Sequence, residues 1–225
     1  MNVIELAGRT PAQKQGLLSQ LVVPRPIAMI TTLDAGGGLN VAPFSYYMPV
    51  SGEPPIVAVT VGATREATLA PKDTWLNLTA SGELVINVTT VELAEHIEAV
   101  AREYPRGVNE AEVAGWRTVP SARVAPPSLA DSPAHLECRV REVIDRGDHT
   151  SCFSGVHIVL AEVLCITADD SILSGPGRID PTKVRAIGRM GFPWFVTTTE
   201  DTLFNQDRVK YADIGTTSVI AAPTI

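Results

Sequence analysis

The sequence predicts a mainly β (α+β) protein whose strands run antiparallel. Three observations support this class. Short runs of apolar and β-branched residues recur along the chain, glycine and proline clusters separate them, and only a few segments show helical spacing. Because closure leaves no unpaired strand edge, many short antiparallel strands favour a barrel over an open sheet.

The clearest strand pattern lies in residues 25–61. Its expected elements are a strand at 27–33, a glycine turn at 36–38, a strand at 40–51 and a strand at 56–61. Glycine permits the tight reversal, and proline marks strand ends, so we expect a three-stranded antiparallel meander. Pro43 interrupts the middle strand. That strand either offers free backbone groups to a flat heteroaromatic ligand or is an edge strand with polar residues facing water.

The rest of the chain is expected to form one domain over residues 1–225. Residues 1–20 are weakly helical, and a short helix that Asp73 or Thr74 caps is expected within 65–80. A strand at 84–89 and a longer helix that Thr90 caps follow. A long connection at 104–133 then leads to paired strands at 134–144 and 152–167 and to an arm or tail at 200–225. Alternation in the strand at 134–144 places His135, Glu137, Arg139 and Arg141 on its polar side.

Composition limits the classes of partner. The 225 residues carry a net charge of −7 and a pI near 5.1, which argues against nucleic-acid or anionic-membrane partners. The start of the chain lacks a signal-peptide pattern, and the longest apolar run is too short to cross a bilayer, so we expect a cytoplasmic protein. Three widely spaced cysteines suit neither a disulfide framework nor a zinc site, so no metal is expected.

Several segments together resemble a known family. They read PRPIAMITT, NVAPFSYYMPVSGEPPIVAVTV, KDTWLNL, SGELVINV, SPAHLECRV and HIVLAEV, in this order, between residues 21 and 195. They resemble the flavin reductase-like, FMN-binding split β-barrel family, which includes flavin reductase components of two-component monooxygenases and the flavoredoxins. The resemblance implies an antiparallel split β-barrel with flanking helices, usually a homodimer with FMN near the subunit interface.

The resemblance also implies which residues bind the isoalloxazine ring, a flat group that needs an apolar slot and backbone or side-chain donors. The matching segment beside the ring contains Asn40, Ala42, Ser45 and Tyr46, and Thr31 and Thr32 lie on the adjoining strand. The alternative role of all six is strand packing, and β-propensity alone explains the two threonines.

A phosphate needs cations and amide or hydroxyl donors, ideally at a helix N-terminus. The candidates are Lys72 and Thr74 in the matching KDT block, Arg65 near them, and Arg189 further along the chain. The alternative is a plain capped helix with an exposed lysine.

His157 lies on a strand that the family places near the flavin, although histidines on apolar strands are more often core or edge residues. Phe192, Trp194 and Phe195 form either a lid over the ring or a hydrophobic anchor, and we favour the anchor.

The chain has no G-x-G-x-x-G after a strand and no G-x-S-x-G elbow. A nicotinamide donor would therefore bind in the open flavin cleft and pass its hydride directly to N5 of the flavin, a reaction that depends mainly on positioning. We expect NAD(P)H-dependent reduction of flavin with FMN as cofactor or substrate, and a possible monooxygenase partner. The alternatives are a flavoredoxin-type FMN electron carrier reduced by a protein, and a ligand-binding barrel without redox turnover.

Overall fold

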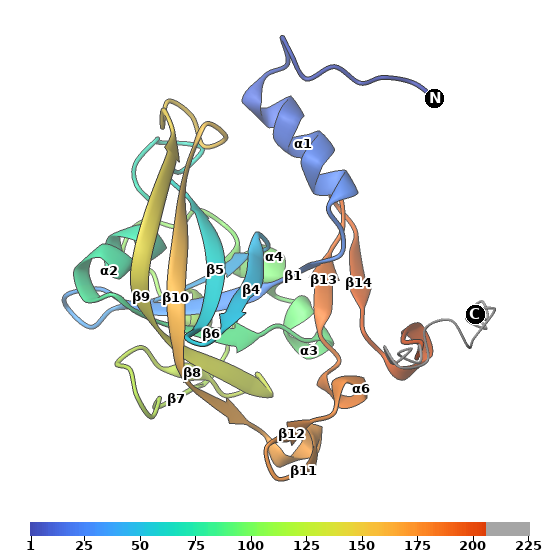
Figure 1. Ribbon diagram of the computed structural model, residues 1–225. Coiled ribbons are helices and arrows are strands. Elements are labelled where there is room, and N and C mark those ends of the chain that lie inside the picture. The colour runs from blue at the N-terminus through green and yellow to red at the C-terminus, as the bar shows by residue number, and fades with distance from the viewer. Residues whose placement is uncertain (206–225) are drawn as a thin grey trace.

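The computed structural model describes residues 1–205, and its main element is a seven-stranded antiparallel sheet in the order β3-β2-β6-β9-β10-β5-β4 (Figure 1). The strands are β2 (Ala28–Leu33), β3 (Leu39–Phe44), β4 (Tyr47–Gly52), β5 (Pro55–Gly62), β6 (Glu83–Val88), β9 (Ala134–Gly147) and β10 (Gly155–Ala168). The expected class, mainly β with antiparallel strands and flanking helices, is confirmed.

Smaller elements surround this sheet. A three-stranded sheet contains β1 (Arg25–Pro26), β13 (Ile187–Arg189) and β14 (Phe195–Thr197), and two hairpins pair β7 (Thr118–Val119) with β8 (Ser128–Leu129) and β11 (Leu173–Gly175) with β12 (Arg178–Ile179). The helices are α1 (Pro11–Leu21), α2 (Asp73–Ser81), α3 (Val91–Ala94), α4 (Ile97–Val100), α5 (Glu110–Val113) and α6 (Pro181–Val184). Short 3-10 turns cover Asp170–Ile172 and Glu200–Thr202.

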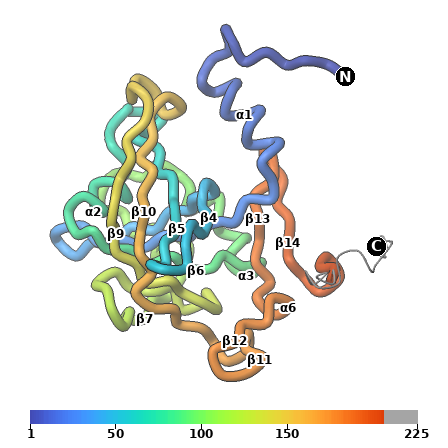
Figure 2. The backbone as a smooth tube through the Cα atoms, viewed as in Figure 1, coloured from blue at the N-terminus to red at the C-terminus, as the bar shows by residue number. Residues whose placement is uncertain are grey.

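Helix α1 stands apart from the seven-stranded sheet and leads through β1 into the small sheet (Figure 1). The long β9–β10 hairpin runs beside β5, and its turn lies near the top of the view in Figure 2. No helix in residues 1–205 is long and apolar enough to cross a membrane. The part of the expected C-terminal arm at 206–225 lies outside the described residues.

The expected three-stranded meander is wrong. The segment at 40–51 forms two strands: β3 pairs with β2, β4 pairs with β5, and they occupy opposite edges of the sheet. The chain crosses between the two edges at Ser45 and Tyr46, where the Tyr46 carbonyl accepts a hydrogen bond from the Thr60 amide at 2.8 Å. This crossing separates β3 from β4 and produces the split in the sheet.

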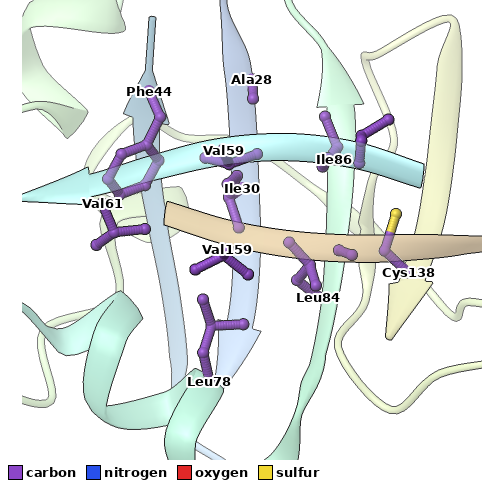
Figure 3. Packing of buried hydrophobic residues seen from close by; sticks show 12 residues of the cluster. Ala28, Ile30, Phe44, Val59, Val61, Leu78, Leu84, Ile86, Cys138 and Val159 are labelled. Carbon is purple, nitrogen blue, oxygen red and sulfur yellow. The ribbon is translucent and has the colours of Figure 1, made fainter. Parts of the chain in front are cut away.

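Two apolar cores lie on the two faces of the sheet. Alternation along β2 sends Ala28 and Ile30 into the first core and Met29 into the second. Figure 3 shows Ile30, Val59 and Val159 gathered in the first core, with Leu78 of α2 packed beside them. Full burial of each such aliphatic side chain is worth roughly 1.5–3 kcal/mol, so these faces hold the sheet and α2 together.

Two helix expectations need correction. Helix α2 begins at Asp73 with Lys72 as its N-cap, whereas Asp73 or Thr74 was expected to cap it. The Asp73 carboxylate is instead held in ion pairs with Arg65 and Arg106, so it does not cap the helix. The longer helix expected after Thr90 is two four-residue helices, α3 and α4, because the chain leaves helical geometry between them.

Glu137 was expected on the polar side of its strand, but its side chain is fully buried. Its carboxylate accepts hydrogen bonds from the amides of Ala122 and Arg123, which belong to the long connection at 104–133. A segment distant along the sequence therefore supplies the partners that permit this burial.

The three aromatic residues near 192–195 do not act as one group. Phe195 packs against the second core, whereas Phe192 and Trp194 are 79% and 71% exposed. Phe195 alone therefore serves as the hydrophobic anchor that the sequence analysis favoured.

Candidate functional site

A cleft opens between the N-terminus of α2, the edge strand β3 and the segment 100–104. Its lining includes Asn40, Ala42, Arg65, Lys72, Thr74 and Glu110. The residues that line the cleft come from β3, before the chain crossing at Ser45 and Tyr46, and from α2 and later segments, after it. A sheet edge beside a helix N-terminus can offer a ligand strand carbonyls and helix amides. At this edge the Val41 amide already donates to Glu110.

A second hollow lies on the other side of Pro43 and Phe44. Its lining includes Ser45, Tyr46, Lys72, Cys152, Phe153 and Val156. Lys72 borders both hollows, so it lies in one continuous region with four of the expected ring-binding residues: Asn40, Ala42, Ser45 and Tyr46.

Asn40 is held in place by a buried polar chain. Its Nδ2 donates to Thr74 Oγ1 at 3.0 Å and to Thr32 Oγ1 at 3.4 Å, and Thr32 Oγ1 also accepts from Asn77 Nδ2 at 3.1 Å. Thr32 therefore lies beneath the cleft and supports Asn40. Thr31 points to the opposite face of the sheet, where its hydroxyl donates to the Pro127 carbonyl at 2.6 Å, so it lies outside the cleft.

The cations near the cleft differ in how far they are already paired. Arg65 donates to Asp73 at 2.6 Å and to the Tyr104 carbonyl, and Arg106 lies 3.0 Å from the same Asp73 carboxylate. Lys72 forms no ion pair with any residue in the described part of the chain, 1–205. Arg102 also lines the cleft without an ion pair among these residues, but of the two only Lys72 stands at the N-terminus of α2.

Helix α2 offers this anion a further contact. No side chain caps its N-terminus, and Lys72, Asp73 and Thr74 all border the cleft. The first amides of a helix lack intrahelical acceptors and carry the positive end of its dipole. An anion in the cleft would meet these amides together with the Lys72 ammonium group.

Two carboxylates in the cleft were missed by the sequence analysis. Burial favours the neutral form of Glu103, but hydrogen bonds from the Glu66 and Ala67 amides and the nearby Lys72 charge outweigh this and lower its pKa. Burial raises the pKa of Glu110, whose Oε2 accepts a hydrogen bond from the Val41 amide at 2.8 Å. Nothing in the local pattern marked either residue, because both reach the cleft from the long segment that follows α4.

Arg189 and His157 lie outside the cleft. Arg189 is 3.0 Å from Glu98, and its guanidinium stacks over the Phe195 ring at 4.3 Å. It borders a third hollow, whose lining has Ser45 in common with the second hollow. The His157 ring is buried and stacks on Trp75, with centroids 3.6 Å apart and planes 11° from parallel.

Comparison with known proteins explains this arrangement. The sequence model of the flavin reductase like domain matches residues 19–163. The chain belongs to this family. An uncharacterized protein of Deinococcus radiodurans is 34% identical over 214 residues, covering 92% of this chain and 90% of its own length.

Solved structures share the fold. Nitrilotriacetate monooxygenase component B from Bacillus cereus superposes with a TM-score of 0.80 at 23% identity, covering 93% of this chain and 98% of its own. Pseudomonas fluorescens 2-nitrobenzoate 2-nitroreductase superposes with a TM-score of 0.77 at 26% identity, covering 93% of this chain and 94% of its own. The split-barrel fold expected from the resemblance is confirmed, and membership of this family supports a flavin-binding oxidoreductase.

Proposed function

We propose that this protein is a flavin oxidoreductase that holds FMN in the cleft beside α2 and reduces it with NAD(P)H. The observation that carries the proposal is Lys72, a cation without an ion pair among residues 1–205, at the uncapped N-terminus of α2. It stands where the hollow that contains Asn40 and Ala42 meets the hollow that contains Ser45 and Tyr46. Family membership adds independent support.

The donor set fits FMN. Lys72 and the first amides of α2 would hold the phosphate, because a dianion needs a local cation in a protein whose net charge is −7. Asn40 and Ser45 would orient the ring. When bound, FMN supplies an acceptor for the hydride at N5, which no side chain of the cleft can provide.

The protein's own residues contribute positioning. The chain from Asn40 to Thr74 and Thr32 fixes the amide of Asn40, and Glu110 fixes the β3 backbone through Val41. Tyr46, 37% exposed, borders the outer hollow and leaves room for a nicotinamide to approach from solvent. Such alignment of donor and acceptor is the main requirement of direct hydride transfer.

Assembly as a homodimer is part of the proposal. Several apolar side chains near α1 and β4 are exposed. They are Leu18 and Leu21 on α1, Val22 directly after it, and Met48 and Val50 on β4. Several of them line a mostly apolar hollow between the end of α1 and β4. Since α1 buries none of its own residues in this chain, we assign this surface to a second copy. Reduced flavin released from the cleft would suit a monooxygenase component, and the Bacillus cereus neighbour is named as component B of a monooxygenase.

The test is a set of assays on the purified protein. We expect it to bind FMN, and we expect NADH or NADPH to be oxidised in the presence of FMN, with FAD as the comparison flavin. Flavin binding without nicotinamide oxidation would favour the flavoredoxin-type carrier. Absence of binding to FMN and FAD would refute the proposal and favour a barrel without redox turnover.

A further inference from the structure

We propose that Asp145, His149 and His157 form a site for a divalent transition-metal ion of the zinc class near the tip of the β9–β10 hairpin. This departs from the expectation, drawn from cysteine spacing, that the chain holds no metal. The site stands independently of the proposed flavin chemistry, since none of its three residues lines the cleft or the outer hollow.

The three ligand atoms already converge. Asp145 Oδ1 lies 2.8 Å from His149 Nε2 and 3.3 Å from His157 Nδ1, and all three atoms are within 4.8 Å of one another. Metal–ligand bonds of about 2.0–2.2 Å in a tetrahedral site place the ligand atoms roughly 3.3 Å apart. The Asp145–His157 separation already matches this value, and the shorter Asp145–His149 separation needs only a small opening to hold an ion.

His157 carries the second, independent observation. The residue is 6% exposed, and its Nδ1 is buried without a hydrogen-bond partner in the described chain, despite its proximity to Asp145. Buried polar atoms nearly always have a partner, so an unpaired nitrogen facing two other potential ligands indicates a missing one. Stacking on Trp75 holds the imidazole ring in this orientation.

The backbone presents the other two ligands. Asp145 on β9 lies directly opposite His157 on β10 in the strand register, so the ladder itself brings these two together. His149 reaches back from the turn, and its ring occupies space that a side chain at Gly155 would fill, because a Cβ there would lie 2.3 Å from His149 Cδ2. Glycine at position 155 therefore lets the third ligand approach.

The ligand set indicates the class of metal. Two imidazoles and one carboxylate suit Zn²⁺ and related first-row ions, whereas Mg²⁺ and Ca²⁺ prefer oxygen ligands alone. The Asp145 side chain is 61% exposed, which leaves an entry path and room for water as the fourth ligand.

The test uses metal-free protein, prepared with a chelator and desalted, and titrates Zn²⁺ alone by calorimetry. We expect one equivalent to bind with micromolar or better affinity, and we expect Zn²⁺ to raise the melting temperature. Asp145→Asn and His149→Gln should each weaken binding by about tenfold or more, in line with the effect of removing groups at metal sites. His96→Gln and His135→Gln are matched controls, since these are the two histidines outside the cluster, and should bind as wild type does.

Both test residues lie at the exposed end of the hairpin, and melting curves without metal confirm that the variants fold. Absence of saturable Zn²⁺ binding to wild type would overturn the proposal. Equal affinity in wild type and both cluster variants, or loss of binding in the controls alone, would overturn it as well.

Discussion

Replacing Lys72 with alanine should weaken FMN binding strongly and leave riboflavin binding nearly unchanged. The substitution removes the cation at the N-terminus of α2, which forms no ion pair within residues 1–205, while the backbone amides of α2 remain. Riboflavin lacks the phosphate, so it reports on the ring site alone. The comparison separates a phosphate anchor from an exposed lysine beside a helix.

The expected size follows from the contact. A charge-assisted hydrogen bond contributes about 1.5–3 kcal/mol, which corresponds to roughly a ten- to hundredfold change in Kd. Glu103 borders the same cleft and already offsets part of the Lys72 charge. Arg65 cannot replace the lysine without leaving Asp73, to which it is bonded at 2.6 Å. We therefore expect a loss near the lower end of this range.

The assay titrates FMN and riboflavin separately into wild type, Lys72→Ala and Lys14→Ala, and follows flavin fluorescence. Lys14→Ala is the matched control, because Lys14 is an exposed lysine on α1 that borders neither hollow. Melting curves confirm folding. Equal losses for the two flavins in Lys72→Ala, or no loss for either, would refute the assignment of Lys72 to the phosphate.

Three further predictions follow from other parts of the site. Ser45→Ala should weaken FMN binding by about 0.5–1.5 kcal/mol without changing the melting temperature. Asn40→Ala should lower both the FMN affinity and the melting temperature, because Asn40 also joins a buried hydrogen-bond chain. An unchanged melting temperature in Asn40→Ala would contradict this. Burial raises the folded-state pKa of Glu110 above its ordinary value of 4.5, so its contribution to stability is present below that value and is lost as pH rises through the folded pKa. Glu110→Gln keeps an acceptor for the Val41 amide. The melting temperature of this variant should therefore rise relative to that of wild type as pH increases through this window. A difference in melting temperature that does not change with pH would contradict the argument. Light scattering should show a homodimer at micromolar concentration, and a monomer that still binds FMN tightly would contradict the proposed assembly.

Much of the fold could be predicted because its signals are local. The alternation of buried and half-buried positions in β5 and the left-handed conformation of Gly82 at the end of α2 depend on nearest neighbours. The turn at Pro54 between β4 and β5 is similarly local, whereas the interruption expected at Pro43 is wrong, because Pro43 lies inside β3 opposite Met29. What could not be predicted is which strands pair, since β3 and β4 follow each other in the chain yet occupy opposite edges of the sheet.

The candidate site divides in the same way. Asn40, Ser45 and Lys72 could be selected from the matching segments, and the structure places them around one region. Glu103 and Glu110 could not be selected, because the folding of a distant segment brings them to the cleft.

The sequence by itself determined the class of the fold, the family and part of the cleft, because strand periodicity, turn residues and ordered motifs are properties of adjacent positions. Only the tertiary structure decided that Lys72, rather than Asp73, stands at the N-cap, that Glu137 is buried, and that Asp145 and His157 face each other. Each of these depends on groups that are not neighbours in the sequence. The charge or burial of such a residue is set by the groups that folding brings against it, and spacing in the sequence does not record them.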